Sequence, residues 1–170
     1  MEYEIIRSAR RTITITIKDG RVILKAPLKL SDKDAEKIIA SHEKWITEKL
    51  KKAKNRNDIY NSLTDEKIDE LKKDAKKYFK DKMEYFSSIM NLKYGRITIT
   101  SAKTRFGSCS SKGNISFSYR LMLYPEAARE YVVVHELAHL IEMNHSKRFY
   151  QVVERYMPDY KIRKKLLKKL

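Results

Sequence analysis

The segment Tyr131–His145 of this 170-residue chain reads YVVVHELAHLIEMNH. The residues around its first two histidines are apolar, so the sequence predicts a helix that carries the motif His-Glu-x-x-His. His135 and His139 are four residues apart, and on an α-helix residues at this spacing lie one above the other. Their two imidazole nitrogens can therefore point at one zinc ion.

Glu136 lies about 100° around the predicted helix from His135, and so beside the metal. A carboxylate in this place takes a proton from a metal-bound water, which then attacks a carbonyl or phosphoryl centre. The alternative is that the two histidines belong to a core by accident, but a buried glutamate between them is costly without a partner. The motif therefore favours a zinc-dependent hydrolase in which Glu136 is the catalytic base.

A catalytic zinc ion keeps one position for water and needs a third protein ligand, for which His145 is the first candidate. An uninterrupted helix would turn His145 about 120° away from the face of His135, so the helix has to end before it. We expect Asn144 to close the helix in the left-handed conformation and Ser146 to cap the next one.

Two glutamates are rival third ligands. Glu142 follows His139 by three residues and would reach the metal if the helix continued, and Glu154 lies in the following helix. The fourth histidine of the chain, His42, is far from the motif and is expected to be an ordinary surface or core residue.

The chain carries 38 Lys and Arg against 22 Asp and Glu, a net charge of +16. This excess predicts attraction to polyanions such as nucleic acid or nucleotides, or else a lysine-rich solvated surface. The end of the chain, KIRKKLLKKL, reads as an amphipathic helix with Ile162, Leu166, Leu167 and Leu170 on one face, expected to pack or to contact a polyanion.

Cysteine content and hydropathy limit the class of protein further. Cys109 is the only cysteine, which excludes an internal disulfide. The chain has no apolar run as long as a membrane span and no signal peptide at its start, so we expect a cytoplasmic protein. The oligomeric state stays open.

The N-terminal part, residues 1–60, is predicted to be a β-hairpin followed by a helix. Residues 2–7 and 11–17 read as strands, Asp19-Gly20 as a turn and residues 22–26 as the returning strand. Ser31 should cap a long helix that reaches Leu50. The polar stretch 51–62 is the expected domain boundary.

Residues 61–170 are predicted to form a second domain. Thr64 should open a long helix that runs to Met90, with strands at 96–101 and 114–118 and with Pro125 starting the motif helix. Further helices close the chain. Long helices combined with short strands in this order are typical of an α+β fold.

Several segments together resemble the YgjP-like metallopeptidase-domain family, whose relatives include SprT-like proteins. They are residues 104–110 (TRFGSCS), 113–117 (GNISF), 120–121, 131–139, and 144–146 with the aromatic pair 149–150. The resemblance covers most of the chain and is most specific between residues 104 and 150. The family commonly has Trp at the positions of Phe106 and Tyr150, which keep an aromatic ring here.

The resemblance implies a zincin-like core in residues 61–170, with His135, His139 and His145 as ligands of one zinc ion per chain and Glu136 as the base. It implies a metallopeptidase acting on peptides. Some members are described as nucleotide pyrophosphatases acting on uridine triphosphate, which is the second hypothesis. The third is a basic nucleic-acid-binding module with a structural metal, but structural zinc sites usually have four ligands and favour cysteine.

In zincins the strand beside the metal helix presents its edge to an extended substrate, which implies that role for the segment from Arg105 to Ser110. Gly107 would permit another backbone to approach. The candidate substrate-binding residues are Arg105, Ser108, Tyr119 and Arg120; the two arginines suit a carboxylate or phosphate, or else form salt bridges under the helix. Oxyanion stabilisation is open among Arg105, Tyr119, Arg120 and Tyr124, and Cys109 is expected to be a small buried side chain.

Overall fold

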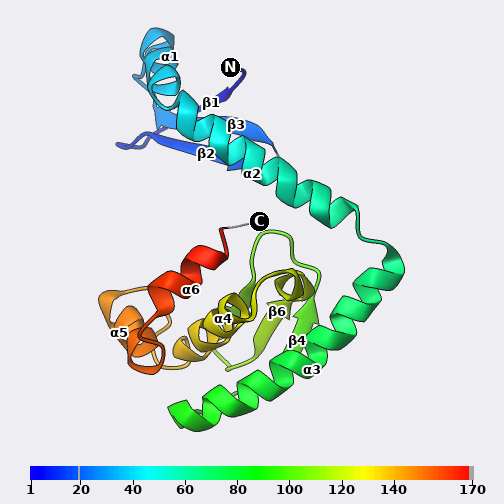
Figure 1. Ribbon diagram of the computed structural model, residues 1–170. Coiled ribbons are helices and arrows are strands. Elements are labelled where there is room, and N and C mark those ends of the chain that lie inside the picture. The colour runs from blue at the N-terminus through cyan, green and yellow to red at the C-terminus, as the bar shows by residue number, and fades with distance from the viewer. Residues whose placement is uncertain (19, 169–170) are drawn as a thin grey trace. The chain divides into compact units, whose positions relative to one another are not determined.

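The computed structural model describes residues 1–18 and 20–168, and these form two compact units that divide after Ser62 (Figure 1). Each unit has its own hydrophobic core. Strands and helices follow one another in separate runs along the described residues, and this confirms the predicted α+β class. No helix in the described ranges is long and apolar enough to span a membrane.

The N-terminal unit is a three-stranded sheet covered by two helices. Strands β1 (Glu4–Ser8), β2 (Thr14–Lys18) and β3 (Arg21–Pro27) pair in the order β1-β3-β2, with β3 antiparallel to β2 and parallel to β1. Gly20 has a φ of 76° at the turn; Asp19, the other residue of the predicted turn, lies outside the described residues. The helices bury Ala35, Ile39 and Ile46 against Val22 and Leu24.

The single long helix predicted after Ser31 is wrong, because it breaks at His42 into α1 (Asp32–Ser41) and α2 (Glu43–Asn61). The Ile38 carbonyl accepts hydrogen bonds from Ser41 Oγ and His42 Nδ1, each at 2.8 Å. The His42 N–H donates instead to Ile39, so side chains replace a regular helical bond. Ser31 caps α1 as predicted, while residues 51–61, expected to be a boundary, are helical.

The C-terminal unit begins with α3 (Asp65–Met90), which is capped by Thr64 as predicted and ends at Asn91 in the left-handed conformation. Strands β4 (Ile97–Thr100), β5 (Gly107–Cys109) and β6 (Ile115–Ser118) form a sheet in the order β4-β6-β5. The central strand β6 is parallel to β4 and antiparallel to β5. The sheet therefore has two edges, one at β4 and one at β5.

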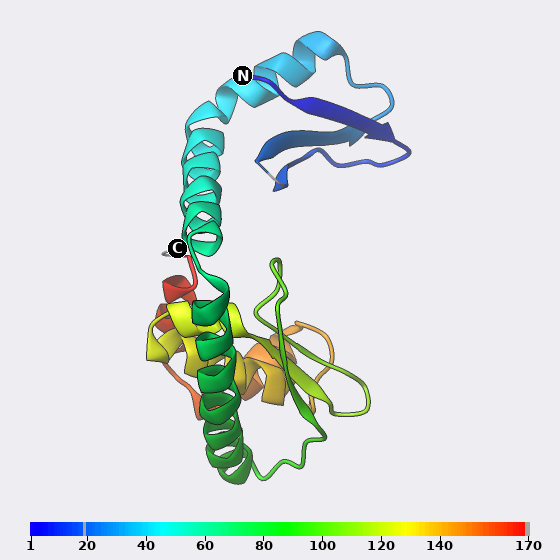
Figure 2. The ribbon, with the colours of Figure 1, turned by 90° about the vertical axis from the view of Figure 1, so that its right-hand side faces the viewer.

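A 3-10 turn, η1 (Tyr119–Leu123), leads into α4 (Glu126–Ala138), and α5 (Lys147–Tyr156) and α6 (Tyr160–Leu166) follow. Figures 1 and 2 show α4 in the interior of the unit, where it contacts α3, α5, α6 and β5. The Glu130 carboxylate on α4 accepts from Lys82 on α3 and from Arg163 on α6, both at 2.6 Å. These two ion pairs join three helices.

In the basic tail, only some of the apolar residues predicted to pack on one helix face are buried. Leu166 and Leu167 are half-buried, but Ile162 is 67% exposed, so its expected packing role is wrong. The α6 helix ends too early for a long apolar stripe, and it contacts α4 through the Arg163–Glu130 ion pair and through the buried Tyr160, whose ring stacks on Tyr131. Leu170 lies outside the described residues.

Candidate metal centre

The three histidines of the motif region meet at one point. One ring nitrogen from each of His135, His139 and His145 lies within 4.8 Å of the other two, and the Nε2 atoms of His135 and His145 are 3.0 Å apart. A tetrahedral zinc ion with Zn–N bonds of about 2.0–2.1 Å holds its nitrogen ligands about 3.3 Å apart. The donor atoms and their spacing therefore suit zinc.

The chain brings His145 back by ending the helix early. Helix α4 stops at Ala138, and the N–H groups of Leu140 and Glu142 close the turn on the carbonyls of Leu137 and Ala138. The predicted left-handed stop at Asn144 is wrong, because Asn91 is the only described non-glycine residue with a positive φ. The helix therefore ends well before Asn144, in a turn whose N–H groups donate to the last carbonyls of α4.

Ser146 caps α5, as predicted, by accepting a hydrogen bond from the Phe149 N–H at 3.3 Å. This first turn of α5 places Phe149 beneath the histidines. The Phe149 ring is fully buried, and its centroid lies 4.5–4.8 Å from the ring centroids of His135, His139 and His145. One aromatic ring thus supports all three imidazoles. Sequence reasoning did not assign it to the site, although it follows His145 by one helical turn.

Hydrogen bonds orient two of the imidazole rings. His139 Nδ1 lies 3.2 Å from the Glu142 carbonyl, which can only accept, so Nδ1 carries the proton and Nε2 keeps its lone pair. His135 Nδ1 lies 3.4 Å from the Tyr131 hydroxyl. Tyr131 was missed in the sequence, although it precedes His135 by four residues on the same helical face.

Burial keeps His135 and His139 in the neutral form that binds metal. It lowers the pKa of His135 to about 3, with smaller contributions in the same direction from His139 and His145. Burial also lowers the pKa of His139. At neutral pH both rings therefore present a free lone pair without first having to lose a proton.

Glu136 is buried beside this cluster, with 4% of its surface exposed. Burial raises the pKa of its carboxyl to about 8, and the positive charge of Arg105 opposes that shift. A Cβ atom added to Gly107 would lie 2.5 Å from Glu136 Oε1. The group that approaches Gly107 in this structure is thus the Glu136 side chain, whereas the sequence predicted the approach of another backbone. The contact with Glu136 explains why this position of β5 lacks a side chain.

A cavity of about 230 Å³ opens next to His135 and Glu136. Phe106, Val132 and Leu167 supply apolar walls, and Lys164 contributes a cation. The Lys164 ammonium donates to the Tyr150 hydroxyl at 3.3 Å. Local sequence carries no signal for Lys164 and Leu167, because only the packing of the C-terminal residues against α4 brings them here.

The four candidate substrate-binding residues have different environments. Arg105 is exposed and acts electrostatically on Glu136, while Ser108 on β5 is half-buried with its Oγ 2.7 Å from Ser116 Oγ. Tyr119 is buried, and Arg120 is buried with its guanidinium donating to the Ser101 carbonyl at 3.1 Å. Arg105 and Ser108 are therefore the accessible pair, and Tyr119 and Arg120 are the buried pair.

The rival ligands lie outside the histidine cluster. Glu142 contributes its backbone carbonyl to His139, and Glu154 is exposed with its carboxylate 3.8 Å from Lys161. Cys109 is half-buried rather than buried, and burial together with nearby Glu136 raises the pKa of its thiol. Tyr124 is buried with its ring packed edge-on against Phe106.

Comparison with known proteins identifies a family whose sequence model matches the chain. The sequence model of the family described as "YgjP-like, metallopeptidase domain" matches residues 11–69 and 60–170. None of the curated proteins compared with the chain matches it.

Two solved structures are similar to parts of the chain. The crystal structure of the metallopeptidase zymogen of Pyrococcus abyssi abylysin is 25% identical, with a TM-score of 0.48, over 52% of this chain and 90% of that one. The metallopeptidase zymogen of Methanocaldococcus jannaschii jannalysin is 21% identical, with a TM-score of 0.45, over 54% and 95% respectively.

Proposed function

Since the chain belongs to the YgjP-like metallopeptidase domain family, we propose that it is a zinc-dependent peptidase with Glu136 as its catalytic base. The observation that carries the proposal is the convergence of three imidazoles beside one buried carboxyl group. His135, His139 and His145 are the proposed ligands. They leave a fourth position for water or substrate, as in catalytic rather than structural zinc sites.

Zinc bound by these histidines would polarise the scissile carbonyl and acidify a water molecule. Glu136 accepts a proton from the attacking water and delivers it to the leaving amine. The raised pKa of the Glu136 carboxyl near 8 falls when a dication lies beside it, so the carboxylate form needed to take the proton is stabilised. The packing of Gly107 against this carboxyl keeps it in place.

The edge of β5 is the proposed binding site for the peptide backbone. Hydrogen bonds from Ser118 to Phe106 and from Ser110 to Asn114 fix the pattern of the antiparallel β5–β6 ladder. In this pattern the backbone groups of Gly107 and Cys109 point away from β6 toward the open edge. An extended peptide that pairs with this edge would lie beside Glu136.

The cavity next to Glu136 suits a side chain of such a peptide, with Phe106, Val132 and Leu167 around it. Arg105 and Ser108 flank the same edge and are the proposed side-chain contacts. The nucleotide hypothesis rests on the resemblance and is permitted by the positive charge of the chain, but of the two arginines that suit a phosphate only Arg105 is exposed. We therefore propose a peptide as the substrate.

The test is the variant Glu136→Gln, assayed with zinc-loaded protein on an unfolded casein substrate. The amide matches the carboxylate in shape but accepts no proton, so we expect hydrolysis to fall at least about a hundredfold. Zinc content and thermal unfolding should match the parent protein. Glu142→Gln is the matched control and should keep full activity. Retained hydrolysis in Glu136→Gln would refute the base role.

A further inference from the structure

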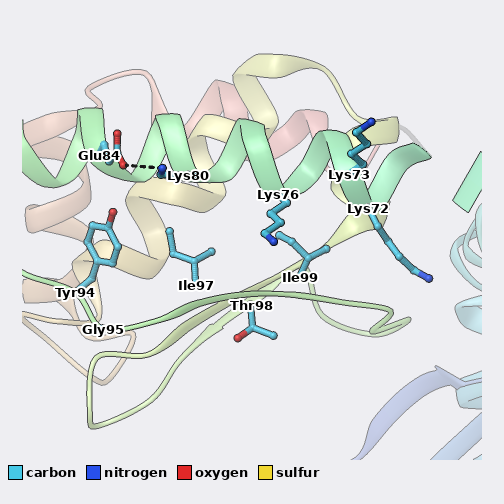
Figure 3. Close-up of a pocket in the computed structure, with 10 residues that line it drawn as sticks. All are labelled: Lys72, Lys73, Lys76, Lys80, Glu84, Tyr94, Gly95, Ile97, Thr98 and Ile99. Atoms are coloured by element: carbon cyan, nitrogen blue, oxygen red, sulfur yellow. Dashed lines mark ion pairs between the residues drawn. The ribbon is translucent and has the colours of Figure 1, made fainter. Parts of the chain in front are cut away.

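A second hollow of the C-terminal unit, about 750 Å³ in volume, lies between α3 and β4 (Figure 3). Lys72, Lys73, Lys76 and Lys80 line it from α3, and Ile97 and Ile99 line it from β4. We call it the lysine groove. In the strand order β4-β6-β5, β4 is the edge opposite β5. The groove therefore borders the edge of the sheet away from Glu136.

Positive charge in the lysine groove is poorly balanced. Lys72, Lys76 and Lys80 follow one another at intervals of four residues and share a face of α3. Glu84 is the one acidic residue of the lining, 3.9 Å from Lys80, and Lys72 pairs with Asp69 at 3.0 Å. Like charges at this spacing destabilise a helix. The row of lysines therefore does not stabilise α3, whereas an acidic ligand would neutralise its charge.

The floor of the groove is an apolar and open strand. In Figure 3 the side chains of Ile97 and Ile99 point toward α3, whereas that of Thr98 points away. The Ile115 N–H donates to the Arg96 carbonyl at 3.0 Å, and β4 and β6 are parallel with Ile97 opposite Ile115. The ladder then uses backbone groups of residues 96, 98 and 100, and it leaves those of Ile97 and Ile99 directed to the open edge.

The spacing of the lysines along α3 is close to the spacing of alternate side chains along an extended strand. Lysines four residues apart on α3 are separated by a rise of about 6 Å along the helix. Every second residue of an extended strand is separated by about 6.6 Å. A strand added beside β4 would thus place alternate side chains in step with Lys72, Lys76 and Lys80, and Figure 3 shows α3 and β4 running side by side.

We propose that the lysine groove docks an extended segment of a partner protein with acidic residues at alternate positions. The segment adds to β4 as a fourth strand, its backbone pairing with Ile97 and Ile99 and its carboxylates facing the lysines. Strand addition supplies affinity through the main chain and specificity through alternate side chains. A nucleic acid also carries negative charge, but its backbone offers no peptide groups to pair with the open edge. This site is separate from the proposed peptidase site.

The experiment measures binding of a short synthetic peptide that alternates glutamate and valine to the full-length protein. One variant carries Lys72→Gln, Lys76→Gln and Lys80→Gln. The control carries Lys77→Gln, Lys93→Gln and Lys112→Gln, an equal loss of charge at exposed residues that do not line the groove. We expect at least about fivefold weaker binding for the first variant and no change for the control.

Strand addition has its own readout. Binding should slow hydrogen exchange at the amides of Ile97 and Ile99, and N-methylation of the peptide backbone should abolish binding at unchanged charge. Equal losses in both triple variants, unaffected binding of the N-methylated peptide, or absence of binding would each overturn the proposal. So would tighter binding of a single-stranded oligothymidylate of equal charge through the same three lysines, since the groove would then be a nucleic-acid site.

Discussion

The two edges of the C-terminal sheet carry two different kinds of chemistry. At the β5 edge, Gly107 contacts a buried carboxyl group, and three imidazoles surround one aromatic ring. At the β4 edge, four mostly exposed lysines of α3 line a groove beside an open strand. Buried groups act through fixed positions and low solvation, while exposed charges act additively and are screened by salt. Single substitutions should therefore be severe at β5 and mild at β4.

The largest expected effect is that of Phe149→Ala, because this fully buried ring packs against all three histidines. We expect a loss of about 3–5 kcal/mol in the free energy of unfolding, as for other buried aromatic residues. Urea unfolding of the metal-free protein measures it. Tyr85→Ala is the control, because Tyr85 is 59% exposed. A loss no larger than that of the control would show that Phe149 does not support the site.

Gly107→Ala should have the next largest effect at the β5 edge. The added methyl group would lie 2.5 Å from Glu136 Oε1, so either the strand or the carboxyl group must move. We expect a stability loss of about 1–3 kcal/mol and a marked loss of hydrolysis. Ser108→Ala, on the same strand, should preserve the Glu136 position. Unchanged stability and hydrolysis in Gly107→Ala would mean that the Glu136 carboxyl group is not held by β5.

A smaller effect is expected from salt, which should weaken binding at the β4 edge and leave zinc binding at the β5 edge unchanged. Raising the salt concentration from about 0.05 M to about 0.5 M shortens the screening length severalfold and should weaken binding of the acidic peptide to the lysine groove. Zinc content, measured on the same samples, should not change. Loss of zinc in parallel with peptide binding would show that the β5 site is not shielded from solvent in the way its burial implies.

The smallest expected effect is that of removing the N-terminal unit. Both edges and all the proposed zinc ligands lie in the unit that begins after Ser62. We propose that residues 61–170 fold alone, bind zinc and bind the acidic peptide as the full chain does. Metal analysis and thermal unfolding of this fragment test the boundary. An insoluble or metal-free fragment would show that the two units form one cooperative structure.

Local signals predicted much of the fold because they act within a few residues. The caps at Ser31, Thr64 and Ser146 are side-chain hydrogen bonds to the first turn of each helix, and all three are present. The break at His42 was missed because two side chains compete for one carbonyl, Ile38. Propensity and periodicity carry no information about that competition.

The candidate site was predictable only where its geometry follows from one helix. The spacing of His135 and His139 fixes their common face, but the early end of α4 depends on the turn that follows it. Phe149 and Lys164 come to the site through the packing of α5 and α6 against α4. Burial of Arg120, a predicted substrate-binding residue, is likewise a product of tertiary structure.

Zinc content of His145→Ala tests the central claim most directly. We expect about one zinc ion per chain in the parent protein and a strong loss in this variant, because two imidazoles bind zinc far more weakly than three. His42→Ala is the matched control, since His42 is exposed and outside the cluster, and it should keep full occupancy. Undiminished zinc in His145→Ala would contradict the three-histidine centre.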